Sequence, residues 1–319
     1  MKPRILLTGA TGFVGISLLK RLTGMDYEVT CLVRNKKKTN KLKNLNVKLI
    51  FGDITKKNSL ENSVRGIDVV LHLAVLVSVS ECIKNPVAAV QTNILGTLNL
   101  LEEIRKEASK SKREIFMIYL SSDKVYGNSR SKLVTENTNP NPLDTYSMSK
   151  LNSELMLNCY SLSYGNLSYI ILRSANIYGY GQSTNFFIPS VISQILQGKN
   201  QIEVGNTNYF RNFVYIDDLV DAIILLLQKR NKNKNQVFNL SQSSVKASSI
   251  LRLMKRLAAT YLNREIKFFR SEKLIRPSSL ESKKFRLDCS KIAKIGWKPK
   301  VKFDTGLRKT FLAFSNENG

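Results

Sequence analysis

Residues 5–22 read ILLTGATGFVGISLLKRL, and this stretch indicates the fold before any other part of the chain. An apolar, strand-like run ends at Thr8, and a segment with the apolar spacing of a helix begins at Phe13. Glycines between a strand and a helix permit a tight turn, and the helix N-terminus offers free N–H groups to an anion. The spacing GxxGxxG therefore predicts a Rossmann-type dinucleotide site, whose pyrophosphate loop consists of Gly9, Thr11, Gly12, Phe13, Val14 and Gly15.

Apolar runs and helix-like stretches alternate through the first half of the chain. The strand candidates are RILLTG, YEVTCLV, VKLIFGD, DVVLHLA, IFMIYLSS and YIILR. Helices are expected between them over residues 13–22, 58–65, 86–108 and 147–162. Near-continuous apolar strands are typical of sheets that helices cover on both faces, so the pattern predicts an α/β fold with a doubly wound parallel sheet.

The regular alternation loosens after Arg173. We expect an NAD(P)-binding Rossmann domain over residues 1–175 and a smaller α+β substrate-binding lobe over residues 176–319. The stretch VFNLS at 237–241 has the character of a strand, so we expect a segment spanning roughly 212–241 to rejoin the sheet.

Residues at the ends of the second, third and fourth strands predict which dinucleotide binds. Arg34 follows the second strand, at a position where NAD-selective proteins commonly carry an acid for the ribose 2′-hydroxyl. A guanidinium can instead pair with a 2′-phosphate, which favours NADP over NAD, and the alternative is that Arg34 belongs to a basic surface loop. The other expected pocket residues are Asp53 and Ile54 after the third strand, and Leu73, Ala74 and Val75 after the fourth.

A second motif carries the chemistry. The fifth strand ends in YLSSDKVYG, and DTYSMSK follows about twenty residues later, so that Tyr146 and Lys150 share one face of a helix. A lysine ammonium beside a phenol favours the phenolate, so we expect Lys150 to lower the pKa of Tyr146 and make it a general base or acid. Ser122, at the carboxyl end of its strand, is placed to hydrogen-bond the same substrate oxygen. These three residues predict oxidation or reduction of a hydroxyl or keto carbon.

Composition limits the class of protein. The chain has 319 residues, of which 43% are hydrophobic and 23% charged, as in a globular protein. The opening MKPRILLTGA shows no secretory signal, and the apolar runs are shorter than the roughly 20 residues of a membrane-spanning helix. Four scattered cysteines and a single histidine, His72 in VVLHLAV, predict reduced thiols, a cytoplasmic location and no metal site. We interpret His72 as a core or cofactor-side residue.

The formal charge of +26 raises a nucleic-acid or anionic-membrane hypothesis. The basic residues are spread over several segments and are interleaved with asparagine, as in NKKKTNKLKNLN. This pattern is typical of a solvated surface, so we do not expect nucleic acid as a partner. A family member repurposed for nucleic-acid binding or regulation remains the alternative, and retention of the Ser, Tyr and Lys set speaks against it.

Taken together, these motifs resemble the extended short-chain dehydrogenase/reductases, in particular the nucleotide-sugar epimerase, dehydratase and reductase group. The resemblance covers nearly the whole chain and includes GATGFVG, YxxxK, GDI, HLA, NILGTLNLLE, LRSANIYG, RNFVYIDDLVDA and DCSKIAKIGWKP. It implies a nucleotide-sugar substrate, with Asn93 near the cofactor, and we also expect a homodimer. The residues implied for substrate binding are Ser78, Ser122, Asn176, Asn185, Arg211 and Arg276, of which the two arginines suit a diphosphate.

The resemblance implies chemistry at C4 of a nucleotide-linked hexose. Tyr146 would take the 4-hydroxyl proton while hydride passes to the nicotinamide. Asp123 and Lys124 match the pair that moves protons in sugar 4,6-dehydratases, although they also suit a loop ion pair. HLAV, YGY and RPSS depart from the usual HLAA, YGP and RPGD. Epimerisation, 4,6-dehydration and 4-keto reduction all stay open, as does reduction of a non-sugar alcohol, against which Arg211 and Arg276 speak.

Overall fold

The computed structural model describes residues 2–25, 27–129, 131–275 and 285–317, which form two compact units. The first unit consists of Met1–Val125, Asp144–Arg173 and Val220–Phe238, and the second of Tyr126–Leu143, Ser174–Leu219 and Asn239–Gly319. The chain thus leaves the first unit twice and returns to it. Residues 126–143, which lie inside the range expected for the Rossmann domain, cluster with the second unit.

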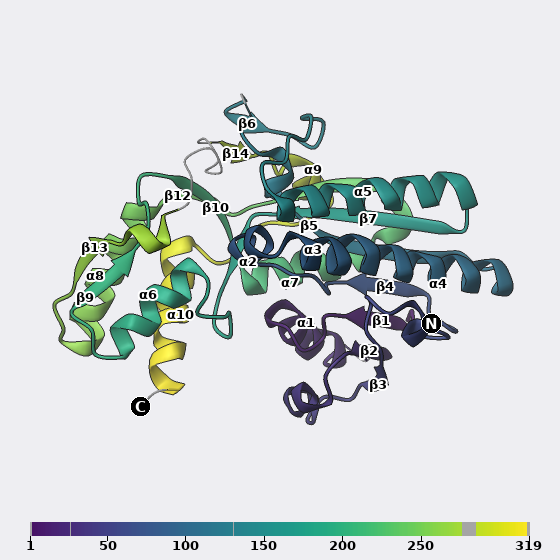
Figure 1. Cartoon of the computed structure of the whole chain (residues 1–319), viewed down its shortest axis with the longest axis horizontal. Helices are drawn as coiled ribbons and strands as arrows, with labels where there is room; N and C mark the ends of the chain where they lie inside the picture. Colours follow the sequence, from purple (N-terminus) through teal and green to yellow (C-terminus); the bar gives the residue numbers. More distant parts are fainter. Residues whose placement is uncertain (1, 26, 130, 276–284, 318–319) are drawn as a thin grey trace. The chain divides into compact units, whose positions relative to one another are not determined.

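The first unit is built on a seven-stranded sheet with the order β11-β7-β5-β4-β1-β2-β3 (Figure 1). The pairings of β1 with β2 and β4, of β2 with β3, and of β4 with β5 are parallel. The predicted doubly wound α/β fold is confirmed. The strands are β1 (Ile5–Thr8), β2 (Val29–Val33), β3 (Lys48–Phe51), β4 (Val69–His72), β5 (Ile115–Ser122), β7 (Leu167–Ser174) and β11 (Gln236–Leu240).

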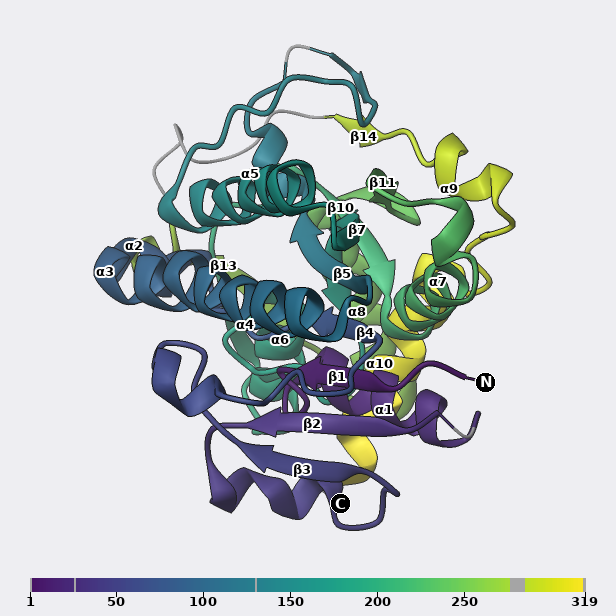
Figure 2. The same cartoon turned by 90° about the vertical axis from the view of Figure 1, so that its right-hand side faces the viewer.

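Helices cover both faces of this sheet, so its central strands are buried. Every residue of β1, β4 and β7 is buried, whereas the edge strand β3 exposes most of its side chains. Figure 2 shows α4 and α5 together on one side of the sheet and α7 on the other. The helices are α1 (Phe13–Thr23), α2 (Val79–Lys84), α3 (Pro86–Ala89), α4 (Gly96–Ser111), α5 (Thr145–Tyr164) and α7 (Ile216–Gln228), with short turns η1 (Lys36–Leu42), η2 (Lys57–Leu60) and η5 (Arg230–Lys232).

Two predicted helices differ from the structure. The helix expected over 86–108 is divided, because a π-helical turn, η3 (Val90–Leu95), separates α3 from α4. The helix expected over 58–65 is wrong: only the 3-10 turn η2 forms there, and Asn62 adopts a left-handed backbone with φ of 60° that no helix accommodates.

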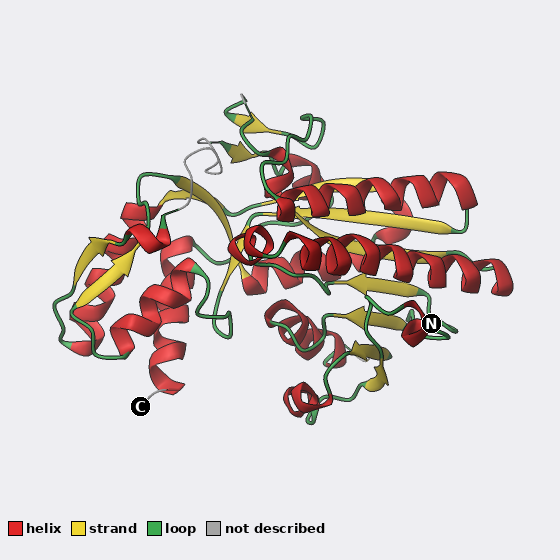
Figure 3. Ribbon diagram, in the orientation of Figure 1, coloured by secondary structure: helices red, strands yellow, loops and turns green. Residues whose placement is uncertain are grey.

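The second unit carries three small sheets and four helices among its described residues (Figure 3). Asp218 joins two of its segments: its side chain accepts hydrogen bonds from the backbone N–H groups of Lys300 (2.8 Å) and Val301 (3.2 Å). The elements are β6 (Leu133–Val134), β8 (Asn176–Tyr178), β9 (Gln201–Val204), β10 (Phe210–Tyr215), β12 (Ser243–Lys246), β13 (Lys267–Arg270), β14 (Arg286–Leu287), α6 (Phe187–Leu196), α8 (Ala247–Leu262), α9 (Ser290–Lys294), α10 (Phe303–Glu317) and η6 (Glu272–Leu274). The turn η4 (Asp123–Tyr126) begins in the first unit and ends at the first residue of the second. Across the described residues, every helix is too short or too polar to span a membrane.

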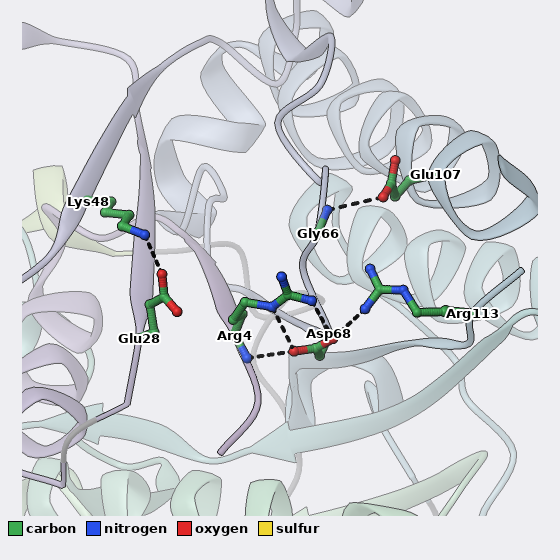
Figure 4. A network of polar contacts seen from close by, with 7 residues as sticks. All are labelled: Arg4, Glu28, Lys48, Gly66, Asp68, Glu107 and Arg113. Atoms are coloured by element: carbon green, nitrogen blue, oxygen red, sulfur yellow. Dashed lines mark hydrogen bonds and ion pairs between the residues drawn. The ribbon is translucent and has the colours of Figure 1, made fainter. Parts of the chain in front are cut away.

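An ionic network fastens the amino ends of the three central strands of the first unit (Figure 4). Asp68, just before β4, accepts hydrogen bonds from the Arg4 backbone N–H at 2.8 Å and from the Arg113 guanidinium at 2.9 Å. Burial favours protonation of Asp68, but the hydrogen bonds and charges of Arg4 and Arg113 outweigh it and lower its pKa. Because the network lies at the amino ends, the carboxyl ends of the same strands take no part in it.

A buried ion pair joins α5 to β7. Arg173 Nη2 lies 2.6 Å from Glu154 Oε2, and Arg173 Nε lies 3.1 Å from the same oxygen. Ser121 donates a hydrogen bond to the other carboxylate oxygen of Glu154. The two charged side chains are only 7% and 4% exposed, so neither has water to replace its partner.

Removing one partner should therefore cost far more than removing a surface charge. We expect Arg173→Met to lower the free energy of unfolding by about 3–5 kcal/mol, because it leaves the Glu154 carboxylate buried and uncompensated. The matched control is Lys234→Met, whose partner Glu114 is exposed, and a loss below about 1 kcal/mol is expected there. Urea denaturation measures both, and equal losses would contradict the role given to the buried pair.

Candidate active site

The glycine loop at the end of β1 admits no side chain at two positions. Gly9 has φ of +74°, and a Cβ there would lie 2.7 Å from the carbonyl carbon of Leu73. A Cβ at Gly15 would lie 2.3 Å from the Gly9 carbonyl oxygen. The Gly12 N–H donates to the Gly9 carbonyl at 3.0 Å, and Gly12 serves as N-cap of α1 with no described side chain capping the helix. Thr11, Phe13 and Val14 complete this turn, which fits a pyrophosphate at the helix N-terminus.

Arg34 and Asp53 lie at the carboxyl ends of two neighbouring strands, β2 and β3. Arg34 Nη1 lies 3.9 Å from Asp53 Oδ2, and the Arg34 side chain is 68% exposed. Asp53 Oδ1 accepts hydrogen bonds from the backbone and the hydroxyl of Thr55 at 3.0 and 2.9 Å. Ile54 is buried against Gly96, where a Cβ would lie 2.8 Å from its side chain. The exposed guanidinium is free to turn toward an anion, because its ion pair with Asp53 is long.

The loop after β4 is held by hydrogen bonds to two side chains, those of Thr8 and Asn93. The backbone N–H groups of Leu73 and Ala74 donate to Thr8 Oγ1 at 3.2 and 3.1 Å. The Asn93 amide, for which we expected a cofactor contact, accepts from the Leu76 N–H at 2.8 Å and donates to Ser149 Oγ at 2.8 Å. Val75 lies between these anchored residues. Asn93 therefore connects this loop to helix α5.

Ser78, predicted to bind substrate, ends the same loop. Its hydroxyl accepts a hydrogen bond from the Glu81 N–H at 3.2 Å and so caps helix α2. This bond uses one acceptor site of the hydroxyl, and its donor capacity stays available to a ligand.

Ser122, Tyr146 and Lys150 come together where β5 ends and α5 begins. Asp144 starts α5 with a capping box, in which it accepts from the Ser147 N–H at 2.8 Å, so that Tyr146 and Lys150 stand in the first two turns. Tyr146 is hydrogen-bonded to Ser122. The Lys150 ammonium donates to the Leu120 carbonyl at 2.6 Å and lies 4.5 Å from the centre of the Tyr119 ring.

The expected direction of the Tyr146 pKa shift is wrong. Burial raises the pKa of Tyr146, the hydrogen bond with Ser122 opposes this, and the negative charge of Asp123 adds to the rise. Burial also lowers the pKa of Lys150, to about 7, and the negative charge of Glu154 opposes that shift. In the protein alone, Tyr146 is thus a protonated acid.

Asp123 and Lys124 follow Ser122 directly, in the turn η4. Asp123 is 2% exposed. The backbone N–H of Lys124 donates to Ser122 Oγ at 3.2 Å, which fixes the start of the turn against the predicted catalytic serine. A buried carboxyl group therefore stands one residue from Ser122, within electrostatic reach of Tyr146.

Three of the predicted substrate residues belong to the second unit. Asn176 on β8 and Arg211 on β10 share the three-stranded sheet, and the Asn176 amide donates to the Asn212 carbonyl at 2.8 Å. The Arg211 guanidinium lies 5.9 Å from the centre of the Phe187 ring. Asn185 precedes α6, and its backbone N–H donates to Ser183 Oγ at 3.3 Å. Arg276 lies outside the described residues.

Thr8 and Thr97 are residues of the site that sequence reasoning did not single out. Both are fully buried and both touch His72, Thr8 from the end of β1 and Thr97 from α4. A signal for Thr8 exists in the sequence, since it is the polar residue that ends an otherwise apolar strand just before the glycine loop.

Comparison with known proteins agrees with this architecture. A sequence model described as the NAD dependent epimerase/dehydratase family matches residues 5–241. A protein of Methanocaldococcus jannaschii with the provisional name UDP-glucose 4-epimerase is 30% identical, with 98% of this chain and 99% of that protein covered. The dTDP-glucose 4,6-dehydratase of Haemophilus influenzae is also 30% identical, with 96% of each covered.

A solved structure gives the same result in three dimensions. The UDP-glucose 4-epimerase of Thermotoga maritima, crystallised with UDP-glucose, superposes with a TM-score of 0.86 at 26% identity and covers 99% of this chain and 100% of its own. Since the family match spans most of the sequence and the relatives align over almost their full lengths, the chain belongs to the NAD-dependent epimerase/dehydratase family, nucleotide-sugar enzymes of the extended short-chain dehydrogenase/reductase type.

Proposed function

We propose that this protein transfers hydride at C4 of a nucleotide-linked hexose, with Tyr146 as the acid/base group. The proposal is supported by the position of Ser122 at the carboxyl end of β5, where a side-chain hydrogen bond links it to Tyr146, and by Lys150, which donates to the Leu120 carbonyl of the same strand. Substrates of parallel α/β sheets bind at this edge. A family relationship to UDP-glucose and dTDP-glucose enzymes supports the sugar class.

The residues divide the work at the reacting oxygen. Ser122 and Tyr146 hold the 4-oxygen by two hydrogen bonds, and Tyr146 exchanges a proton with it. Lys150, whose pKa lies near 7, supplies positive charge behind the phenol when it is protonated and holds the nicotinamide ribose. A nicotinamide bound here would supply the hydride acceptor for C4. The glycine loop, Asp53, Ile54 and Leu73–Val75 form its binding surface.

The family is NAD-dependent, and the choice between NAD and NADP rests on Arg34. Its guanidinium is exposed at the end of β2 and pairs only weakly with Asp53, 3.9 Å away. We propose that Arg34 reads a 2′-phosphate, so that NADP binds more tightly than NAD.

Asp123 distinguishes 4,6-dehydration from epimerisation and from 4-keto reduction. Loss of water across C5 and C6 requires an acid for the departing hydroxyl, whereas epimerisation and 4-keto reduction do not. The Asp123 carboxyl is buried, next in sequence to Ser122 and close enough for its negative charge to raise the pKa of Tyr146. We propose 4,6-dehydration as the preferred branch, with Lys124 beside Asp123 in the second proton transfer.

The remaining assignments concern the substrate and the assembly. We propose that Ser78, Asn176, Asn185, Arg211 and Arg276 contact the sugar nucleotide. In support, Asn176 and Arg211 lie on strands of one sheet, and guanidinium groups match diphosphate oxygens. The homodimer, the cytoplasmic location and the domain boundary at residue 175 stay predictions.

Tyr146→Phe removes the exchangeable proton and keeps the ring. We expect turnover to fall by about 10²–10⁴-fold, with sugar-nucleotide affinity nearly unchanged, because a general acid/base contributes in this range. The matched control is Tyr160→Phe, on the same helix but hydrogen-bonded to Glu102, which should keep wild-type turnover. Stopped-flow absorbance of the reduced nicotinamide measures the step, and near-wild-type rates in Tyr146→Phe would refute the assignment.

Arg34→Ala tests the choice of cofactor. Loss of one charge-assisted hydrogen bond should weaken NADP binding by about 1.5–3 kcal/mol and NAD binding much less, because only NADP carries the 2′-phosphate. Lys41→Ala removes an exposed charge from the same basic segment and controls for general electrostatic attraction. Calorimetry gives both affinities; equal losses for the two dinucleotides in Arg34→Ala would exclude phosphate reading.

Asp123→Asn keeps size and removes the transferable proton. We expect dehydration to slow by about 10²–10⁴-fold while C4 oxidation continues, so that reduced dinucleotide accumulates on the enzyme. Products are analysed by mass after incubation with UDP-, GDP-, CDP- and dTDP-hexoses. A wild-type enzyme that never loses water from any of them, together with unaltered activity of Asp123→Asn, would move the assignment to epimerisation or reduction.

A further inference from the structure

The chain contains a single histidine, and both of its ring nitrogens are engaged in the interior of the first unit. His72 ends β4, immediately before the loop that begins at Leu73, and is 1% exposed. Its Nδ1 lies 2.7 Å from Thr8 Oγ1 and its Nε2 lies 3.0 Å from Thr97 Oγ1. The ring thus bridges the end of β1 and the start of α4.

The surroundings of Thr8 define which way the first hydrogen bond runs. Its hydroxyl accepts from the N–H groups of Leu73 and Ala74, at 3.2 and 3.1 Å. A hydroxyl has two acceptor sites and one proton, so both acceptor sites of Thr8 are filled and its proton is left for His72. Nδ1 of His72 is therefore an unprotonated acceptor.

The surroundings of Thr97 define the second bond independently. The Thr97 hydroxyl donates its proton to the Asn93 carbonyl at 2.6 Å, so toward His72 it can only accept. Nε2 of His72 must then carry the proton. The two ends require the same neutral tautomer, and the hydrogen bonds run in one direction from Thr8 through His72 and Thr97 to Asn93.

This chain of hydrogen bonds holds the loop after β4 at two points. Thr8 fixes the N–H groups of residues 73 and 74, and Asn93 fixes residue 76 and also Ser149, the neighbour of Lys150 on α5. The Gly9 backbone lies directly against Leu73, so the position of this loop determines the shape of the surface beside the glycine turn.

We propose that His72, as the neutral Nε2–H tautomer, is a positioning residue that sets the loop 73–76 for the dinucleotide. This inference rests on the proposed binding of a dinucleotide at the glycine loop. A protonated ring would place a second N–H against Thr8, whose acceptor sites are already filled, so protonation would break the chain.

The charged surroundings agree with a neutral ring. Burial lowers the pKa of His72 to about 3, and the positive charge of Lys150 on α5 acts in the same direction. From β5 the neutral ring of Tyr119 lies 5.7 Å away, centre to centre, and burial raises its pKa. From β1 and α4 the facing groups are the uncharged Thr8 and Thr97.

Nitrogen NMR of wild-type protein labelled with ¹⁵N-histidine tests the tautomer without any activity. One histidine gives one pair of ring signals, and we expect a protonated Nε2, a bare Nδ1 and no titration between pH 8 and 5. An Nδ1–H tautomer, or a midpoint near the ordinary histidine value of about 6.5, would overturn the proposal.

Substitutions of Thr8 test the positioning role. Thr8→Val keeps the shape but leaves Nδ1 and the Ala74 N–H without a partner, and it leaves the Leu73 N–H only its bond to the Thr8 carbonyl at 3.3 Å. We expect the Kd of NADPH to rise by about 10-fold or more, with turnover at saturating cofactor much less affected. Thr8→Ser should restore binding, and Thr23→Val, whose hydroxyl bonds only within α1, is the control. Unchanged NADPH binding by Thr8→Val would overturn the positioning role. Failure of the wild type to bind either NADPH or NADH would refute the proposed function and leave the tautomer result standing.

Discussion

One close approach of backbone to backbone governs the first unit. The Gly9 turn lies so near the end of β4 that any side chain at residue 9 would collide with Leu73, and a Cβ at residue 15 would collide with Gly9 itself. These contacts set the direction in which α1 leaves the sheet and bring its N-terminus over the carboxyl edge. This packing also positions the loop after β4. Thr8 accepts hydrogen bonds from that loop, and Asn93 links it to the start of α5.

Local signals were sufficient for the sheet, the glycine loop and the placement of Tyr146 and Lys150 one turn apart on α5, because each depends on spacing along the chain. The remaining features depend on contacts between residues that are distant in the sequence. The π-turn at Val90–Leu95 accompanies hydrogen bonds of Asn93 to Leu76 and Ser149, which are distant in sequence. The pKa of Tyr146 rises because folding buries it, and a motif contains no information about burial.

Ion pairs offset part of the large positive charge of this fold. The buried Arg173 is paired with Glu154, and the partly exposed Arg113 with Asp68. At the exposed edge strand β3, Lys36 lies over the Phe51 ring at 5.2 Å and Lys48 pairs with Glu28. Lysines along an unpaired edge discourage strand addition by another chain, which gives part of the basic surface a structural use.

The sheet is assembled from pieces of chain that are synthesised far apart. The edge strand β11 belongs beside β7, and Tyr169 is tied to Asn235 by reciprocal hydrogen bonds of 2.7 and 3.0 Å. Between β7 and β11 the chain passes through the second unit over residues 174–219 and then returns to the first unit. A nascent chain on the ribosome therefore carries β7 with an open edge until about 60 further residues have emerged, and such delayed, long-range closure is slow and favours recruitment of chaperones.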